Sequence, residues 1–308
     1  MGQCAQPDDP LSPSPGTPGE GWGEGSSASA RNSSVLQNPH PSPLPAYRAR
    51  EQDGRRVALF ITCLTDQFHP HVGIAVTKVL EHFGCRVSFP QSQTCCGQPF
   101  YNNGFHDEAR RLARRMVEVF EPYEWVVTPS GSCCAMVREH VPRLLQGDHA
   151  YEHGAQRVAR NTYEFVEFLD RVLNVDLSKL SLPAPRTLTY HYTCHLRALG
   201  VRDEAVRMLQ QLGNVELIPL EKADQCCGFG GTFAVKYPAI SGAIADDKVN
   251  CIARTGAGET VCNDAGCSMN LAGLCHRRGV GQRFVHIAEL IAEALGLPLV
   301  ICPAPGSS

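Results

Sequence analysis

The sequence predicts an α/β fold in which two similar repeats each form a small parallel sheet flanked by helices. Short apolar runs alternate with segments whose apolar residues recur at helical spacing, which is the pattern of right-handed β-α-β crossovers. The same order of segments, with the same spacing of cysteines, occurs twice along the chain. The chain has 308 residues, 43% of them hydrophobic, and can therefore bury a sizeable core.

Residues 1–54 are predicted to be a disordered head. They contain 9 Pro, 7 Gly and 8 Ser and show neither helical nor strand periodicity. A secretory signal would place basic residues before an apolar block, and the head lacks that pattern. We therefore expect a cytoplasmic, reducing location, in which cysteines remain thiols.

The composition argues against two classes of partner. No run of roughly 18 uncharged apolar residues is available to span a membrane. The 28 Lys and Arg residues are balanced by 31 Asp and Glu residues, a net charge of −3, whereas a nucleic-acid binder needs a basic surface. We expect neither a membrane span nor nucleic-acid binding.

The first repeat is predicted to cover residues 55–182. Its predicted strands are 57–61, 86–89 and 125–128, and the first of them is a short continuous apolar run, as expected for a strand buried on both faces. Its helices carry apolar residues at helical spacing: 72–83, 109–120 and a single helix over 158–172. Two prolines in Leu182–Pro185 then predict a break between the repeats.

The second repeat is predicted to cover residues 186–302 and to follow the same order. Its predicted strands are 188–192, 216–220 and 259–262. Its predicted helices are 201–212, 238–253 and one that starts near residue 267. The chain is therefore predicted to contain two copies of one structural unit.

Eight cysteines follow the predicted strands in matching positions. Both repeats read Cys, 31 residues, then Cys-Cys-Gly, and both place one more Cys after the third strand. The cysteines are Cys63, Cys95, Cys96 and Cys133 in the first repeat and Cys194, Cys226, Cys227 and Cys267 in the second. Because ligands bind at the carboxyl ends of parallel strands, we expect the four thiols of each repeat to converge. Gly97 and Gly228 would let the backbone approach the bound group closely.

Four thiolates suit either an iron–sulfur cluster or a zinc ion. Structural zinc sites usually use two C-x2–4-C pairs; this chain has no C-x-x-C, and one pair, Cys262-x4-Cys267, reaches the upper end of that range. The spacing favours an iron–sulfur cluster, and zinc stays open for one or both repeats. His191 and His195 flank Cys194, where either could donate a hydrogen bond to a cluster; the ordinary alternative is a histidine whose partners are backbone groups.

The motifs around these cysteines resemble those of a known family, the cysteine-rich proteins with two CCG repeats, and within it the lactate utilization protein A group. The matching segments are Phe60–Asp66, Cys95–Pro99, Pro129–Cys133, Cys226–Phe233, Gly266–Asn270 and His286–Glu289. The resemblance covers about residues 56–294 and leaves the head outside. In the wider family each repeat ends in C-x-x-C and can hold a non-cubane cluster through an extra thiolate.

This chain departs from that ending. Ser130 and Asp264 stand three residues before Cys133 and Cys267, where the family pattern has a cysteine. The resemblance thus implies four cysteine ligands per repeat, with Cys134 and Cys262 as candidate substitutes for the fifth.

The resemblance also implies a function. It predicts a non-autonomous subunit of an L-lactate dehydrogenase system that oxidises L-lactate to pyruvate, carrying electrons through a cluster of the [4Fe-4S] type in one or both repeats. The implied partners are a ferredoxin-type iron–sulfur subunit and a third lactate-utilization subunit. Two alternatives remain: a zinc-binding scaffold in the same kind of complex, and a thiol redox protein similar to heterodisulfide reductases.

Overall fold

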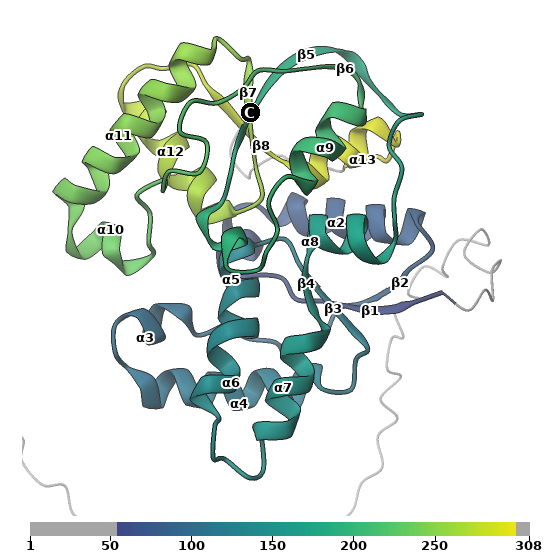
Figure 1. Ribbon diagram of the computed structural model, residues 1–308, viewed down its shortest axis with the longest axis vertical. Helices are drawn as coiled ribbons and strands as arrows, with labels where there is room; N and C mark the ends of the chain where they lie inside the picture. The colour runs from purple at the N-terminus through teal and green to yellow at the C-terminus, as the bar shows by residue number, and fades with distance from the viewer. Residues whose placement is uncertain (1–53, 300–308) are drawn as a thin grey trace, which may run out of the picture. The chain divides into compact units, whose positions relative to one another are not determined.

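The computed structural model describes residues 54–299 (Figure 1). All of the predicted head except Gly54 lies outside the described residues, as do Cys4 and Cys302. No helix among the described residues is both long and apolar enough to cross a bilayer.

The first repeat forms a parallel sheet of four strands. The strand order is β2-β1-β3-β4, with every pair parallel. The strands are β1 (Arg56–Leu59), β2 (Arg86–Ser88), β3 (Trp125–Thr128) and β4 (Thr162–Glu164). The helices are α1 (Cys63–Phe68), α2 (Pro70–His82), α3 (Gln98–Asn102), α4 (His106–Phe120), α5 (Gly131–Ala135), α6 (Val141–Leu144), α7 (Glu152–Asn161) and α8 (Phe165–Glu167). Two short π-helical segments, Met136–His140 and Phe168–Val172, continue α5 and α8.

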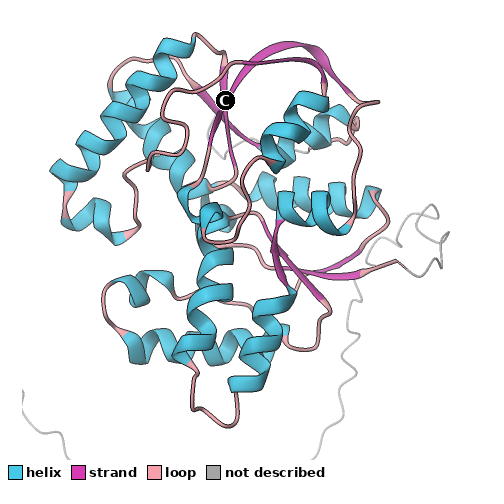
Figure 2. Ribbon diagram, in the orientation of Figure 1, coloured by secondary structure: helices cyan, strands magenta, loops and turns pink. Residues whose placement is uncertain are grey.

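The second repeat forms a separate sheet with the equivalent order, β6-β5-β7-β8, again fully parallel (Figure 2). The strands are β5 (Ser181–His191), β6 (Gly213–Leu217), β7 (Glu259–Cys262) and β8 (Arg283–His286). The helices are α9 (Glu204–Gln211), α10 (Thr232–Lys236), α11 (Pro238–Thr255), α12 (Ala265–Arg277) and α13 (Ile287–Ala294), with a 3-10 turn at Cys194–Arg197. Two sheets of identical order confirm the predicted α/β class and the duplication.

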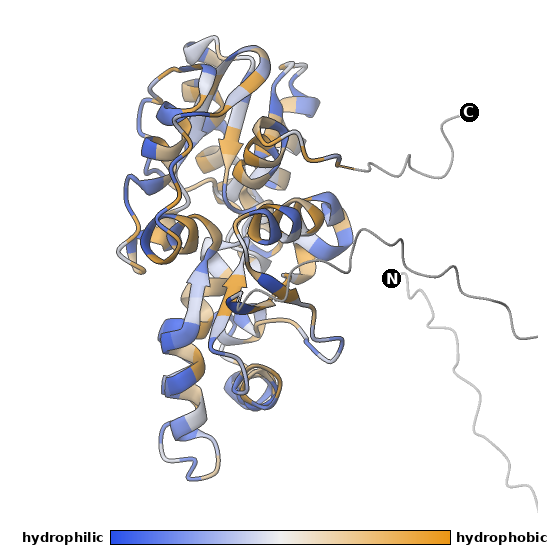
Figure 3. Cartoon of the chain, turned by 90° about the vertical axis from the view of Figure 1, so that its right-hand side faces the viewer, coloured by the Kyte–Doolittle hydropathy of each residue, from blue (hydrophilic) through white to orange (hydrophobic). Residues whose placement is uncertain are grey.

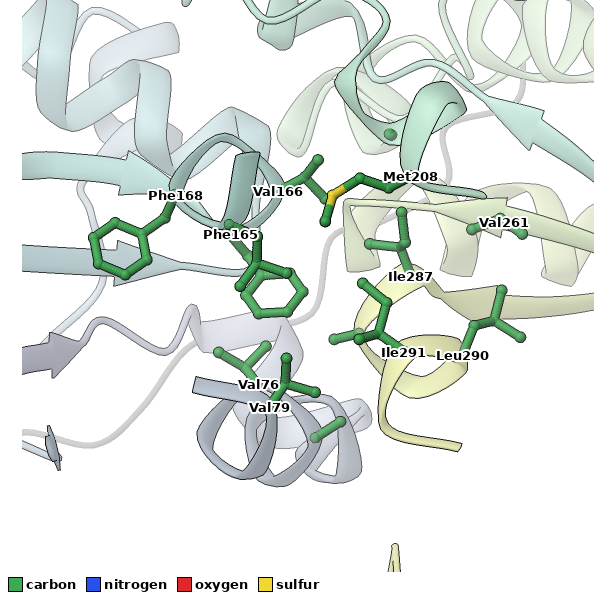
Figure 4. Packing of buried hydrophobic residues seen from close by; sticks show 14 of the residues in the cluster. Val76, Val79, Phe165, Val166, Phe168, Met208, Val261, Ile287, Leu290 and Ile291 are labelled. Atoms are coloured by element: carbon green, nitrogen blue, oxygen red, sulfur yellow. The ribbon is translucent and has the colours of Figure 1, made fainter. Parts of the chain in front are cut away.

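One apolar core is common to both repeats. Helix α2 of the first repeat packs against α13 of the second, and Val76 and Val79 meet Ile287 and Ile291 beside Phe165 (Figure 4). All five of these side chains are fully buried. Figure 3 shows the most hydrophobic residues along the strands and on one side of the helices, as amphipathic helices on a buried sheet require. The two sheets are therefore held together by shared apolar packing.

The predicted single helix over residues 158–172 is wrong, because strand β4 interrupts it. Thr162 and Tyr163 pair with β3, and β-branched and aromatic residues favour an extended backbone. Glu164 then starts a new helix, since its side chain accepts hydrogen bonds from the backbone N–H groups of Val166 and Glu167 at 2.8 and 3.2 Å. Strand β8 was also not predicted, because its polar end residues, Arg283 and His286, leave only two adjacent apolar residues.

The prolines of Leu182–Pro185, predicted to mark a break between the repeats, do not interrupt the secondary structure at this point. They lie inside β5, in a stretch where the pairing with β6 shifts between Ser181 and Arg186. Proline has no N–H to donate to a sheet, so the register skips this stretch. Regular pairing resumes at Arg186 and leads β5 to its carboxyl end at His191.

Candidate metal centres

All eight predicted cysteines line one cavity of about 380 Å³. Each follows the carboxyl end of a strand: the first cysteine follows β1 or β5, the Cys-Cys pair follows β2 or β6, and the last lies near the start of α5 or α12. Residues of both repeats form its walls, including Phe229 and Thr232 of the second repeat and Gln98 of the first. The cavity therefore gives both cysteine sets access to the same space.

In the first repeat the thiols lie in two close pairs. The sulfur atoms of Cys63 and Cys95 are 3.8 Å apart, and those of Cys96 and Cys133 are 3.4 Å apart. Cys96 and Cys133 are buried, whereas Cys63 is exposed at the cavity. The set thus extends from the core to the solvent.

The second repeat repeats this arrangement. The sulfur atoms of Cys227 and Cys267 are 2.9 Å apart and buried, and the exposed Cys226 accepts a hydrogen bond from Gly228 N at 3.3 Å. The sulfur of Cys194 lies 3.7 Å from Nδ1 of His195. Every described cysteine is a free thiol.

The thiols of each set share protons unevenly. Hydrogen bonds from the neighbouring thiols of Cys63 and Cys96 lower the pKa of Cys95, and those of Cys194 and Cys227 lower the pKa of Cys226. The pKa of Cys96 is raised, because its thiol donates to its neighbours and is buried. Each set therefore holds one thiolate readily, and a cation is needed to stabilise the others as thiolates.

The donor sets fit a thiolate-bound metal centre. A tetrahedral ion with metal–sulfur bonds of about 2.3 Å holds its sulfur ligands about 3.8 Å apart, close to the separations of 3.8 and 3.4 Å in the first repeat; the pair in the second repeat, at 2.9 Å, would have to move apart. The adjoining cavity leaves room for more than a single ion. Cysteine thiolates are the ligands of both zinc and iron–sulfur clusters, so the donor chemistry suits either.

The two candidate substitutes lie in different surroundings. Cys262 is buried at the end of β7, where its thiol donates a hydrogen bond to the backbone oxygen of Asp264 at 3.5 Å and the neighbouring Cys267 lowers its pKa. Cys134 is buried in the apolar core shared by both repeats, and its thiol interacts with Arg138. Neither is a wall residue of the cavity, and Cys262 is the one placed beside a predicted ligand.

Ser130 and Asp264, the two departures from the C-x-x-C ending that the resemblance implies, contact each other across the two repeats. One carboxylate oxygen of Asp264 accepts from Ser130 Oγ at 2.8 Å, Ser132 Oγ at 2.8 Å and Ser132 N at 3.1 Å. The other oxygen accepts from Gly266 N at 3.0 Å and caps α12. The hydrogen bonds of Ser130 and Asp264 therefore link the N-termini of α5 and α12. The sequence singles out both residues as departures from the C-x-x-C ending, and it does not predict this contact.

The two glycines after the cysteine pairs adopt left-handed backbone angles, with φ of 88° at Gly97 and 84° at Gly228. A side chain at Gly228 would also meet the carbonyl oxygen of Ser241 in α11 at 2.5 Å, whereas at Gly97 the nearest atom is Leu112 Cβ at 3.5 Å. The close approach at Gly228 is therefore to another helix.

Gly228→Ala is expected to destabilise the protein more than Gly97→Ala. The left-handed backbone should cost about 1–2 kcal/mol at either site, and overlap with α11 should add about 1–3 kcal/mol at Gly228. Denaturant unfolding of the two variants measures the difference. Equal losses would show that α11 moves away without cost.

A buried carboxyl group also joins the repeats. Glu164 is fully buried and accepts a hydrogen bond from Asn263 Nδ2 at 3.2 Å. Burial raises the pKa of Glu164 to about 8, above the value of about 4.3 expected in an unfolded chain. Between these pH values the folded state holds a proton that the unfolded state has lost, so the contribution of Glu164 to stability falls as the pH rises.

Glu164→Gln is expected to flatten the pH dependence of stability. Between roughly pH 5 and pH 8, the free energy of unfolding should fall by about 1–4 kcal/mol less in the variant than in the parent. Chemical denaturation at the two pH values measures this difference. Identical slopes for parent and variant would show that Glu164 does not titrate in this range.

Comparisons with known proteins agree with the duplicated cysteine pattern. The cysteine-rich CCG domain matches residues 57–138 and 188–272. Lactate utilization protein A of Anoxybacillus flavithermus is 44% identical over 236 residues, which are 76% of this chain and 98% of that protein. The protein of the same name from Bacillus velezensis is 43% identical over 237 residues, 77% of this chain and 98% of that protein.

A solved structure shares the fold alone. The crystal structure of a hypothetical protein from Helicobacter pylori aligns with a TM-score of 0.58 at 8% sequence identity, over 80% of this chain. The chain spans half the length of that protein.

Proposed function

Because this chain belongs to the cysteine-rich CCG domain family, in the lactate utilization protein A group, we propose that it is an iron–sulfur electron-transfer subunit of an L-lactate oxidation system. In this role it acts with a ferredoxin-type iron–sulfur subunit and a third lactate-utilization subunit. The names of its relatives support the process. The electron-carrying role is inferred from the cysteines.

The observation that carries the proposal is the cavity shared by the two cysteine sets. Cys63, Cys95, Cys96 and Cys133 would hold one centre, and Cys194, Cys226, Cys227 and Cys267 the other. Bound there, an iron–sulfur cluster would accept and release single electrons. The exposed Cys63 and Cys226 mark where each centre comes nearest to solvent, and hence to a partner.

We place the oxidation of lactate itself in a partner subunit. The cavity walls are mostly apolar residues and thiols, and their charged group, Asp264, is already engaged by serine donors. A lactate carboxylate is best bound by Arg or Lys, and the walls contain neither; His195 is their single residue that could become cationic. The chain therefore acts as a non-autonomous subunit.

Two alternatives each have an observation in their favour. The sulfur separations match those around single tetrahedral ions, which favours a zinc-binding scaffold in the same kind of complex. The common cavity, with exposed thiols from both repeats, would also admit a small disulfide, as in a thiol redox protein similar to heterodisulfide reductases. The experiment below separates the electron-transfer role from the thiol redox alternative, and the metal analysis at the end of the Discussion separates it from the zinc scaffold.

The test uses the chain purified anaerobically with its two partner subunits. Adding L-lactate is expected to bleach the visible absorption of this chain's clusters, while D-lactate serves as the control. If L-lactate reduces the partners and this chain stays oxidised, the electron-transfer role is wrong. Reduction of a disulfide by the chain without partners would favour the thiol redox alternative.

A further inference from the structure

We propose that the imidazole of His191 is a ligand of the metal centre in the second repeat, so that the two centres of this protein differ in their donor atoms. The first centre would be held by thiolates alone, and the second by thiolates and one nitrogen. This inference rests on the part of the proposed function that places a metal at the second cysteine set. It does not depend on which metal binds there.

His191 is buried without a hydrogen-bond partner. It is the last residue of β5, its exposure is 1%, and neither Nδ1 nor Nε2 has a partner among the described residues. Leaving a buried polar group unpaired costs about 1–3 kcal/mol. The ring therefore requires a group that is bound at this place in the working protein.

The ring lies beside two predicted ligands. A ring nitrogen of His191 and the sulfur atoms of Cys227 and Cys267 all lie within 4.8 Å of one another, and all three residues are buried. Around a tetrahedral ion with bonds of about 2.0–2.3 Å, donor atoms are less than about 4 Å apart. Small side-chain movements would therefore bring one metal ion into contact with all three donors.

The equivalent position of the first repeat carries no donor. Thr62-Cys63 corresponds to Thr193-Cys194, so His191 corresponds to Phe60. Phe60 is fully buried and packs edge-on against Phe120, with ring centroids 5.4 Å apart. A phenyl ring cannot coordinate a metal, so the nitrogen donor belongs to the second repeat alone.

The difference predicts an order of reduction potentials. With the imidazole of His191 in place of one of the four cysteine thiolates, the second centre is less negative and its potential is higher, as with the histidine ligands of Rieske centres. If both repeats hold iron–sulfur clusters, the second centre is therefore expected to be reduced first.

The test isolates the second centre by using Cys96→Ser to remove the first. In this background, His191→Phe introduces the residue that the first repeat has at the equivalent position, Phe60. His195→Leu is the matched control, because it introduces the first repeat's residue, Leu64, at the other histidine beside Cys194. X-ray absorption at the edge of the bound metal reports nitrogen in its ligand shell, and pulsed EPR with ¹⁵N-histidine reports it for a paramagnetic cluster.

We expect nitrogen in the parent and in His195→Leu, and none in His191→Phe. The metal affinity of His191→Phe should fall by at least about tenfold, since even outer partners of metal ligands contribute 10- to 100-fold. His191→Cys covers the case in which His191→Phe does not fold. It is expected to keep the metal, replace nitrogen by sulfur in the ligand shell and, for an iron–sulfur cluster, lower the potential.

The outcomes separate this inference from the proposed function. A ligand shell without nitrogen in the parent, or nitrogen that persists in His191→Phe, would overturn the role of His191 even if the centre is an iron–sulfur cluster. Zinc with nitrogen from His191 would support the inference while contradicting the electron-transfer function. A second repeat that binds no metal would overturn both.

Discussion

Cys96→Ser is expected to remove the metal of the first repeat and to leave that of the second, and Cys227→Ser is expected to do the reverse. Each of these thiols is buried and lies next to another predicted ligand of its own repeat, at 3.4 Å from Cys133 and 2.9 Å from Cys267 respectively. A serine hydroxyl does not replace a thiolate for soft metals. In each variant the metal content per chain should therefore fall by about half.

Matched controls are available in both repeats. Cys85 and Cys275 are buried cysteines that are not wall residues of the cavity, so Cys85→Ser and Cys275→Ser should keep the full metal content. Because metal binding and folding are coupled, circular dichroism must show that each variant is folded. If Cys96→Ser and Cys227→Ser both retain all their metal, the assigned ligands are wrong.

Asp264→Ala is expected to lower the free energy of unfolding by about 2–4 kcal/mol, since hydrogen bonds to a charged group contribute about 1.5–3 kcal/mol each and do not add fully. The carboxylate is 5% exposed and accepts bonds from Ser130, Ser132 and Gly266. Asp264→Asn should lower the free energy of unfolding by less, because the oxygen of the asparagine amide can still accept the hydrogen bond that caps α12.

Asp246→Ala is the control for this substitution. Asp246 lies on the surface, where its carboxylate pairs with Arg278 at 2.9 Å and is 48% exposed. Exposed ion pairs contribute about 0–1 kcal/mol, so this variant should remain close to the parent. Denaturant unfolding compares the three variants. A loss at Asp264 no larger than that at Asp246 would show that the contact between the repeats does not stabilise the fold.

Much of the architecture could be predicted from the sequence, because the signals were local. The strand before Cys63 is a continuous apolar run, strands alternate with amphipathic helices, and the spacing of 31 residues recurs unchanged, so the duplicated parallel sheets followed directly. Strand β4 could not be predicted. Thr162 falls on the helical spacing of the apolar residues around it, and the preference of Thr162 and Tyr163 for an extended backbone decides the structure only where they pair with β3.

The cysteine ligands of the site could be predicted from the sequence, and the contacts between the two repeats around the site could not. Each cysteine follows a strand, which is visible in the sequence, and their convergence follows from the parallel topology. The contact between Ser130 and Asp264 depends on how one repeat faces the other, and the sequence of either repeat contains no signal for it. The same holds for His191, whose isolation from other polar groups appears only when β5 is buried.

The most direct test of the central claim is an analysis of iron, acid-labile sulfide and zinc in the anaerobically purified chain. If the two cysteine sets hold iron–sulfur clusters, iron and sulfide should be present together, should be divided between the repeats, and should be lost in part in Cys96→Ser and in Cys227→Ser. Stoichiometric zinc without acid-labile sulfide would contradict the account and identify the chain as a zinc-binding scaffold.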